Sequence, residues 1–130
     1  MWSSDIEDWK TLGGGLESTV VDLARFGDKL ARNEIISPTS QTTMWTPPDT
    51  TNPYAYGWEM DSTIPGRLIA TKTGRQNPGA LSYLEIHPDQ NITIAVLMNS
   101  TRMLDTNRAR TLGVCIRNII LSPTTSTATC

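Results

Sequence analysis

Residues 92–99 constrain the fold of this chain more than any other segment, because both faces of the strand predicted there are apolar. One face carries Ile92, Ile94, Val96 and Met98, and the other carries Ala95 and Leu97. A strand of this kind normally lies inside a sheet that is covered on both faces. The segment therefore predicts a central strand with other elements packed above and below it.

Three further segments also have the two-residue period of strands, and they lie before this one. They are residues 56–60, 67–73 and 81–87. Turn-forming residues, Pro88-Asp89-Gln90-Asn91, separate the last of them from residues 92–99. This spacing predicts an antiparallel hairpin.

Segments with helical periodicity precede and follow the predicted strands. Thr19, with Asp22 three residues later, predicts a capped helix of about three turns that stops near Asn33. Ser37-Pro38 predicts the start of a shorter helix that ends before Pro47. A last helix is expected over residues 105–120, with a buried stripe made of Ala109, Leu112, Ile116 and Ile119. Helices segregated from a meander of strands predict an α+β fold with an antiparallel sheet flanked by helices.

Composition excludes several classes of function. Of the 130 residues, 38% are hydrophobic and 18% charged, as in an ordinary globular domain, and no apolar run is long enough to span a bilayer. The formal net charge of −2 gives no reason to expect nucleic acid or an anionic membrane as a partner. Four scattered arginines are expected on the solvated face of the last helix: Arg102, Arg108, Arg110 and Arg117.

Cysteines and sequons say little about the compartment. Cys115 is expected as a buried thiol beside the last helix's apolar stripe, and its pairing with Cys130 stays open. The acidic start of the chain is no signal peptide, which keeps the chain in the cytosol if Met1 is the native start. Sequons at Asn91 and Asn99 instead favour a secreted or periplasmic location for a full-length protein.

The segment with the most chemistry is Lys72-Thr73-Gly74, at the end of a predicted strand. The lysine offers a charge and hydrogen-bond donors, the threonine a short hydroxyl, and the glycine close access to the backbone. Together they suit an acyl substrate. Structural alternatives remain: Lys72 as an edge-strand lysine that prevents aggregation, Thr73 as an ordinary strand residue, and Gly74 as a turn residue.

Several motifs in order resemble the serine β-lactamase-like and penicillin-binding-protein-like hydrolases, which include class C β-lactamases, DD-peptidases and related esterases. Residues 14–26 resemble the family's glycine-led helix, and Tyr56-Gly57-Trp58 is similar to its aromatic strand. The family's catalytic strand and its neighbour are matched by Lys72-Thr73-Gly74, Pro78-Gly79, Ser82 and His87-Pro88-Asp89. Val96-Leu97-Met98-Asn99 resembles its last sheet strand.

The resemblance implies attack of a serine on an amide or ester, an acyl-enzyme, and release to water, with no cofactor. It implies that Lys72 lies near the nucleophile and attracts the substrate carboxylate, which Thr73 also binds. The N–H one residue past Gly74, that of Arg75, is similar to an oxyanion-hole donor. An arginine there departs from the family's usual small residue.

The nucleophile is missing from this sequence. No serine has a lysine three residues later, and neither Tyr-x-Asn nor Ser-x-Asn occurs. In the family these motifs precede the region matched here, so residues 1–121 are expected to be the C-terminal part of one β-lactamase-like domain, followed by a Ser/Thr-rich tail, 122–130. The alternative is a non-catalytic interaction module or pseudoenzyme on the same scaffold.

Two further expectations complete the sequence analysis. His87, the sole histidine, is expected on the surface beside the hairpin turn, and a metal site is not expected. In the family, strands from the beginning of the chain complete the sheet beside the strand that residues 92–99 resemble. Here only the N-terminal segment or a partner is left to cover that edge. Self-association, pairing with a missing N-terminal part, or marginal stability is therefore expected, because an apolar strand edge recruits other strands.

Overall fold

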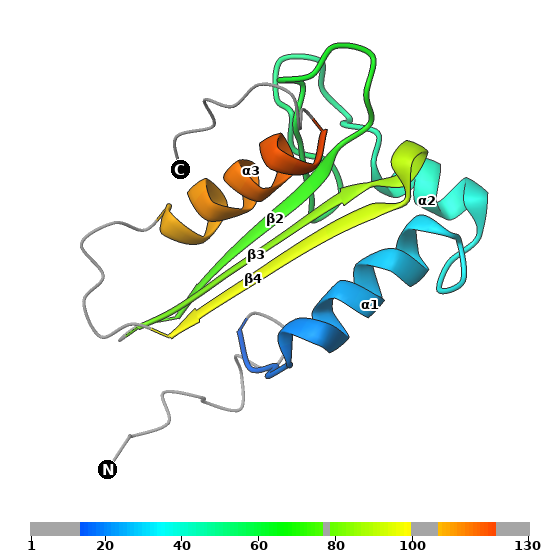
Figure 1. The fold of residues 1–130 in the computed structure, drawn as a ribbon. Coiled ribbons are helices and arrows are strands. Elements are labelled where there is room, and N and C mark those ends of the chain that lie inside the picture. The colour runs from blue at the N-terminus through cyan, green and yellow to red at the C-terminus, as the bar shows by residue number, and fades with distance from the viewer. Residues whose placement is uncertain (1–13, 77–78, 100–106, 122–130) are drawn as a thin grey trace.

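The computed structural model describes residues 14–76, 79–99 and 107–121. Its elements are α1 (Val20–Ala31), α2 (Pro38–Met44), β1 (Glu59–Met60), β2 (Ala70–Gln76), β3 (Ala80–His87), the 3-10 turn η2 (Pro88–Gln90), β4 (Ile92–Asn99) and α3 (Arg108–Leu121). The sheet lies between α1 on one face and α3 on the other (Figure 1). The predicted α+β fold with an antiparallel sheet flanked by helices is confirmed.

The strands form one antiparallel sheet in the order β1-β2-β3-β4. The predicted hairpin between β3 and β4 is present, and Asn91 closes it with a left-handed backbone, φ 54°. The bounds of β4 agree with the prediction, and both of its faces are covered. Within the described residues, however, β4 is an edge strand rather than a central one.

The segment predicted as a first strand, residues 56–60, is mostly loop. Only Glu59 and Met60 pair with β2. Before them the N–H of Ala55 donates to the carbonyl of Trp58 at 2.8 Å, and Gly57 has φ 83°, so the chain turns where alternation predicted extension. The next strand begins at Ala70 and continues to Gln76, later than the predicted range of 67–73.

Each face of the sheet has its own apolar core. On the α1 and α2 side, the buried residues are Leu30, Trp45, Trp58, Ala70, Leu84 and Ile86. Trp45 and Trp58 meet edge to face there, with ring centroids 6.2 Å apart. On the α3 side, the buried residues are Leu81, Tyr83, Ile94, Val96 and Ala109. The side chains of β2 and β3 alternate between these two cores.

Local chemistry explains the two N-terminal helices. Thr19 caps α1, since its hydroxyl accepts a hydrogen bond from the N–H of Asp22 at 3.1 Å, as predicted. Ser37 caps α2 in the same way. At Gly27, α1 comes so close to the sheet that a Cβ would lie 2.6 Å from Cγ2 of Thr93, which places α1 over the boundary between β3 and β4.

The face that α3 buries differs from the predicted one. Ala109 is buried as expected, but Leu112 is 44% exposed and Ile119 53% exposed. Ile116 packs against the core, partly buried, as expected. The helix also buries Gly113, Cys115 and Arg117. Gly113 faces the ring of Tyr83, where a Cβ could not fit, and Arg117 pairs with carboxylates beneath the helix. Close packing and charge pairing therefore set the rotation of α3.

Some predictions fall on residues that the structure does not describe, namely Arg102, the first two residues of the predicted last helix (105 and 106), and the tail 122–130 with Cys130. Cys115 is buried, but it is disulfide-bonded rather than a thiol. Among the described residues, no helix combines the length and the apolar character needed to cross a membrane.

Candidate active site

The backbone of β2 places Lys72 and Gly74 on the same face of the sheet as Ala70, the face covered by α1 and α2. Thr73 and Arg75 point to the opposite face, the α3 side. The side chains of Lys72, Thr73 and Arg75 are all exposed. The four predicted site residues thus share one strand, but the lysine and threonine side chains leave it in opposite directions.

Backbone donors of β2 alternate between the side that faces β3 and the side that faces β1. The N–H of Asp61 donates to the carbonyl of Ile69 at 2.9 Å, so the polar groups of Ile69 face β1. Since these groups alternate along an antiparallel strand, the N–H groups of Thr73 and Arg75 face the same side. Among the described residues β1 pairs only with Ala70 and Thr71, so the N–H of Arg75 points outward beyond the end of β1.

Tyr54 is a component of the site that sequence reasoning missed. Nζ of Lys72 donates a hydrogen bond to the Tyr54 hydroxyl at 2.9 Å and lies 5.1 Å from the centroid of the Tyr54 ring. An aromatic face attracts an ammonium group, so Tyr54 restricts where the Lys72 charge lies. Its position two residues before the Tyr56-Gly57-Trp58 motif was the one available signal.

Gly74 packs closely against the neighbouring strand. It lies opposite Ser82 of β3, and a Cβ at residue 74 would collide with the Ser82 hydroxyl. Any larger residue would therefore require that hydroxyl to rotate away at the point where Lys72 and Arg75 leave the strand. This contact shows a structural role for Gly74 in addition to the backbone access suggested by its sequence context.

A buried polar cluster under α3 was also missed. Glu85, fully buried, accepts a hydrogen bond from the hydroxyl of Tyr83 and contacts Nε2 of His87. The guanidinium of Arg117 lies 3.7 Å from Glu85 and donates to Asp61 at 2.8 Å. The prediction that His87 is a surface residue is wrong, because only 1% of it is exposed.

The same cluster corrects the expected solvated face of the last helix. Arg117 is only 5% exposed. Arg110 is half-buried, and its Nη1 donates to both carboxylate oxygens of Glu59, each at 2.9 Å. Arg108 is exposed, as predicted. Hydropathy alone predicts arginine at the surface, because it contains no information about the carboxylates of residues 59, 61 and 85 that pair with these arginines in the fold.

Burial and pairing shift the pKa values of this cluster. Burial, reinforced by the Glu85 carboxylate, raises the pKa of Tyr83 well above its usual value. Burial alone would raise the pKa of Asp61, but hydrogen bonds from Thr63 and the charge of Arg117 outweigh it and lower that pKa. Burial alone would lower the pKa of Arg110, but the hydrogen bond to Glu59 and the charge of Glu59 outweigh it and raise that pKa. The cluster is therefore closed and fully partnered at its carboxylates, which suits a structural role.

Asp61 gives a prediction for acid stability. Its folded-state pKa is lowered, so its contribution to stability is present above the ordinary carboxyl pKa of about 3.9 and is lost as pH falls through the folded value. The free energy of unfolding of the wild type, measured with urea, should therefore fall as the pH is lowered from about 5 to about 2. Asp61→Asn should make the free energy of unfolding depend less steeply on pH in this range. Glu17→Gln, at an exposed position, is the control. Equal slopes in wild type and Asp61→Asn would contradict the assignment.

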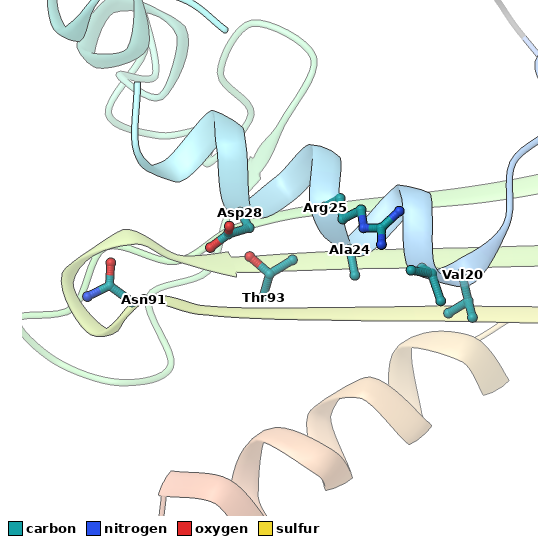
Figure 2. Close-up of a pocket in the computed structure, with 7 residues that line it drawn as sticks. Val20, Ala24, Arg25, Asp28, Asn91 and Thr93 are labelled. Carbon is teal, nitrogen blue, oxygen red and sulfur yellow. The ribbon is translucent and has the colours of Figure 1, made fainter. Parts of the chain in front are cut away.

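The structure also contains a groove of about 520 Å³, lined by Val20, Val21, Ala24, Arg25, Asp28, Asn91 and Thr93 (Figure 2). It lies between α1 and the outer edge of β4, whereas Lys72 lies on β2, two strands away in the sheet. Thus the groove is separate from the candidate site. Among the described residues, no group of histidine, cysteine and carboxylate side chains could hold a metal ion.

Comparisons with known proteins give one match. The family model described as Beta-lactamase matches residues 2–114, which include β2 and the Lys72-Thr73-Gly74 segment. No curated protein and no solved structure matches the chain.

Proposed function

Because the chain belongs to the beta-lactamase family, whose members have a serine-hydrolase-like fold, we propose that it is the C-terminal portion of such a hydrolase. In this proposal the chain supplies the strand that binds an acyl substrate bearing a carboxylate. The serine nucleophile comes from residues outside this sequence, either from the same protein or from another chain. The substrate is an amide or an ester, and the fold does not choose between them.

One observation carries the proposal, namely the exposed position of the Lys72 ammonium on the part of β2 that extends past β1. It is exposed, held by Tyr54, and lies on the strand whose outward N–H groups include that of Arg75. An ammonium and an adjacent backbone donor suit the two acceptor groups that such a substrate presents, its carboxylate and its carbonyl.

Each residue has a distinct role in the proposed reaction. Lys72 attracts the substrate carboxylate. The Thr73 hydroxyl leaves β2 on the opposite face, so in this proposal it binds the same group only where the carboxylate lies across the strand edge. The N–H of Arg75 stabilises the oxyanion that forms when a serine attacks the carbonyl, and one such donor contributes about 3 kcal/mol to transition-state stabilisation. Gly74 leaves room for the Ser82 hydroxyl beside this strand.

A second candidate is a non-catalytic interaction module or pseudoenzyme on the same scaffold. The absence of Ser-x-x-Lys and Tyr-x-Asn from all 130 residues favours it. The encoding reading frame helps to distinguish the two candidates, because an in-frame Ser-x-x-Lys upstream of residue 1 would support the hydrolase.

Turnover assays test the proposal. The isolated chain is expected to show no sustained hydrolysis of a chromogenic cephalosporin or a p-nitrophenyl ester, because it lacks the nucleophile motif. A chain extended to include an upstream Ser-x-x-Lys should hydrolyse at least one of them, and Lys72→Ala should abolish that activity. Sustained turnover by the isolated chain, lost in Lys72→Ala, would show that its site is complete. An extended chain with no activity would favour the pseudoenzyme.

A further inference from the structure

The hairpin between β3 and β4 carries the sequon Asn91-Ile92-Thr93, which the proposed function does not use. Asn91 is exposed, and it follows the 3-10 turn η2 with a left-handed backbone, φ 54° and ψ 40°. Figure 2 shows its side chain on the turn, at one end of the groove. Sequons that accept glycans lie in surface loops of this kind.

Asn91 lies just outside the sheet. The ladder between β3 and β4 ends with the pair His87 and Ile92, so Asn91 comes directly before the first paired residue of β4. A strand that continued the sheet beside β4 would pair with the backbone of Ile92–Asn99 and not with the turn. The exposure of Asn91 therefore does not depend on backbone pairing along β4.

The fold explains the asparagine of this sequon but not its hydroxyl. A left-handed backbone favours asparagine at residue 91 on steric grounds. Thr93 packs its methyl group toward α1, since Cγ2 of Thr93 is the atom nearest to a Cβ placed at Gly27. Valine would supply the same methyl group and is at least as well suited to a strand. The hydroxyl at residue 93 is thus the part of the motif that glycosylation requires and packing does not.

The second sequon, Asn99-Ser100-Thr101, has a different setting. Asn99 is the last residue of β4 and pairs with Ala80 of β3. Residues 100 and 101, which complete the motif, lie outside the described residues. The structure therefore supports Asn91 and makes no case for Asn99.

Cys115 provides independent evidence about the compartment. It is buried on α3 and disulfide-bonded, and the sequence contains one other cysteine, Cys130. Disulfides persist in oxidising environments such as the lumen of the endoplasmic reticulum, and they are rare in the cytosol. Sequons receive their glycans in proteins that enter this secretory route. The bonded cysteine and the exposed sequon thus indicate the same route through different chemistry.

We propose that the chain passes through a eukaryotic secretory pathway and carries an N-linked glycan on Asn91. The co-reactant is an oligosaccharide carried on a lipid pyrophosphate, and the enzyme is an oligosaccharide transferase of the host. The side-chain amide nitrogen of Asn91 forms a bond to C1 of the first sugar and loses one proton. The bond between C1 and the pyrophosphate oxygen breaks, and the lipid pyrophosphate leaves with that electron pair. The product is a bulky, solubilising group on the hairpin turn.

A glycan at this position is compatible with the Lys72 site. The hairpin turn lies beyond the end of the sheet at which β2 begins, at Ala70, whereas Arg75 lies near the other end of β2. The inference does not depend on the hydrolase proposal, because no residue of the Lys72 site takes part in it.

Mass spectrometry of the protein purified from the cells that encode it tests the proposal. Peptide-N-glycosidase F in H₂¹⁸O converts each glycosylated asparagine into ¹⁸O-labelled aspartate, and fragmentation of the peptides locates the label. The label is expected at Asn91, and the unreduced protein is expected to contain Cys115 in a disulfide. Asn91 without the label, or Cys115 as a free thiol, would overturn the proposal.

Variants expressed in cultured eukaryotic cells behind a cleavable secretion signal test the individual residues, with medium and cell extract analysed alike. Asn91→Gln and Thr93→Val should each lose the mass of one glycan, although Thr93→Val keeps Asn91 and the methyl group that faces Gly27. Asn99→Gln is the control and should keep the glycan on Asn91. Thermal melting confirms that each variant is folded. A wild type without a glycan on Asn91, or a glycan there that survives Thr93→Val, would reduce Asn91 to a turn residue.

Discussion

Replacement of Arg117 by methionine is expected to lower the free energy of unfolding by about 3–5 kcal/mol, the usual cost of removing one partner from a buried ion pair. Arg117 donates to Asp61 at 2.8 Å and lies 3.7 Å from Glu85, and all three residues are buried. Methionine fills similar volume but leaves both carboxylates without this cation. Since domains of this size are stabilised by about 5–15 kcal/mol, the loss is a large part of the total.

Urea unfolding followed by circular dichroism measures this effect. Arg108→Met is the matched control, because Arg108 lies on the same helix and is exposed, and its replacement should change stability by no more than about 0.5 kcal/mol. If the two variants lose equal stability, the cluster under α3 does not hold the helix to the sheet.

Replacement of Lys72 by methionine is expected to weaken the binding of a carboxylate-bearing acyl compound such as benzylpenicillin at least about tenfold. A hydrogen bond to a charged group contributes about 1.5–3 kcal/mol, which corresponds to a factor of ten or more in affinity. Lys72 is exposed at the strand edge, so the fold should survive the change. Isothermal titration calorimetry of the isolated chain measures the dissociation constant.

Two variants make this result specific. Lys29→Met removes a lysine of α1 that pairs with Glu34, and it should leave the affinity unchanged. Tyr54→Phe keeps the aromatic ring beside Lys72 but removes the hydroxyl that accepts its hydrogen bond, so a smaller loss is expected. Equal binding by wild type and Lys72→Met would remove Lys72 from the proposed site.

The fold could be predicted where local signals and burial agree. The alternation of residues 92–99 gave the bounds of β4, and the capping residues Ser37 and Thr19 gave the starts of α2 and α1. Prediction failed at residues 56–60, where a glycine with positive φ turns the chain, and in part on α3, where two members of the expected apolar stripe are exposed and Arg117 is buried. The structure at these positions depends on contacts between residues far apart in the sequence, and hydrophobic periodicity contains no information about such contacts.

The candidate site was predicted only in part. Lys72 to Arg75 are consecutive, so one motif found them, and the structure places them together on β2. Tyr54 is 18 residues away from Lys72 in sequence, and its contact depends on a loop. The buried cluster was missed because Glu85, His87 and Arg117 are residue types normally found at the surface. Its members come together only when β3 and α3 pack.

The most direct test of the central claim is an NMR titration of the ¹⁵N-labelled chain with benzylpenicillin. The account predicts that the largest changes in amide chemical shift lie at Lys72 to Gln76, with the N–H of Arg75 among them, and that Lys72→Met reduces these changes. Largest changes along the groove between α1 and β4, or no change in β2 at saturating ligand, would contradict the claim that this strand edge binds the acyl substrate.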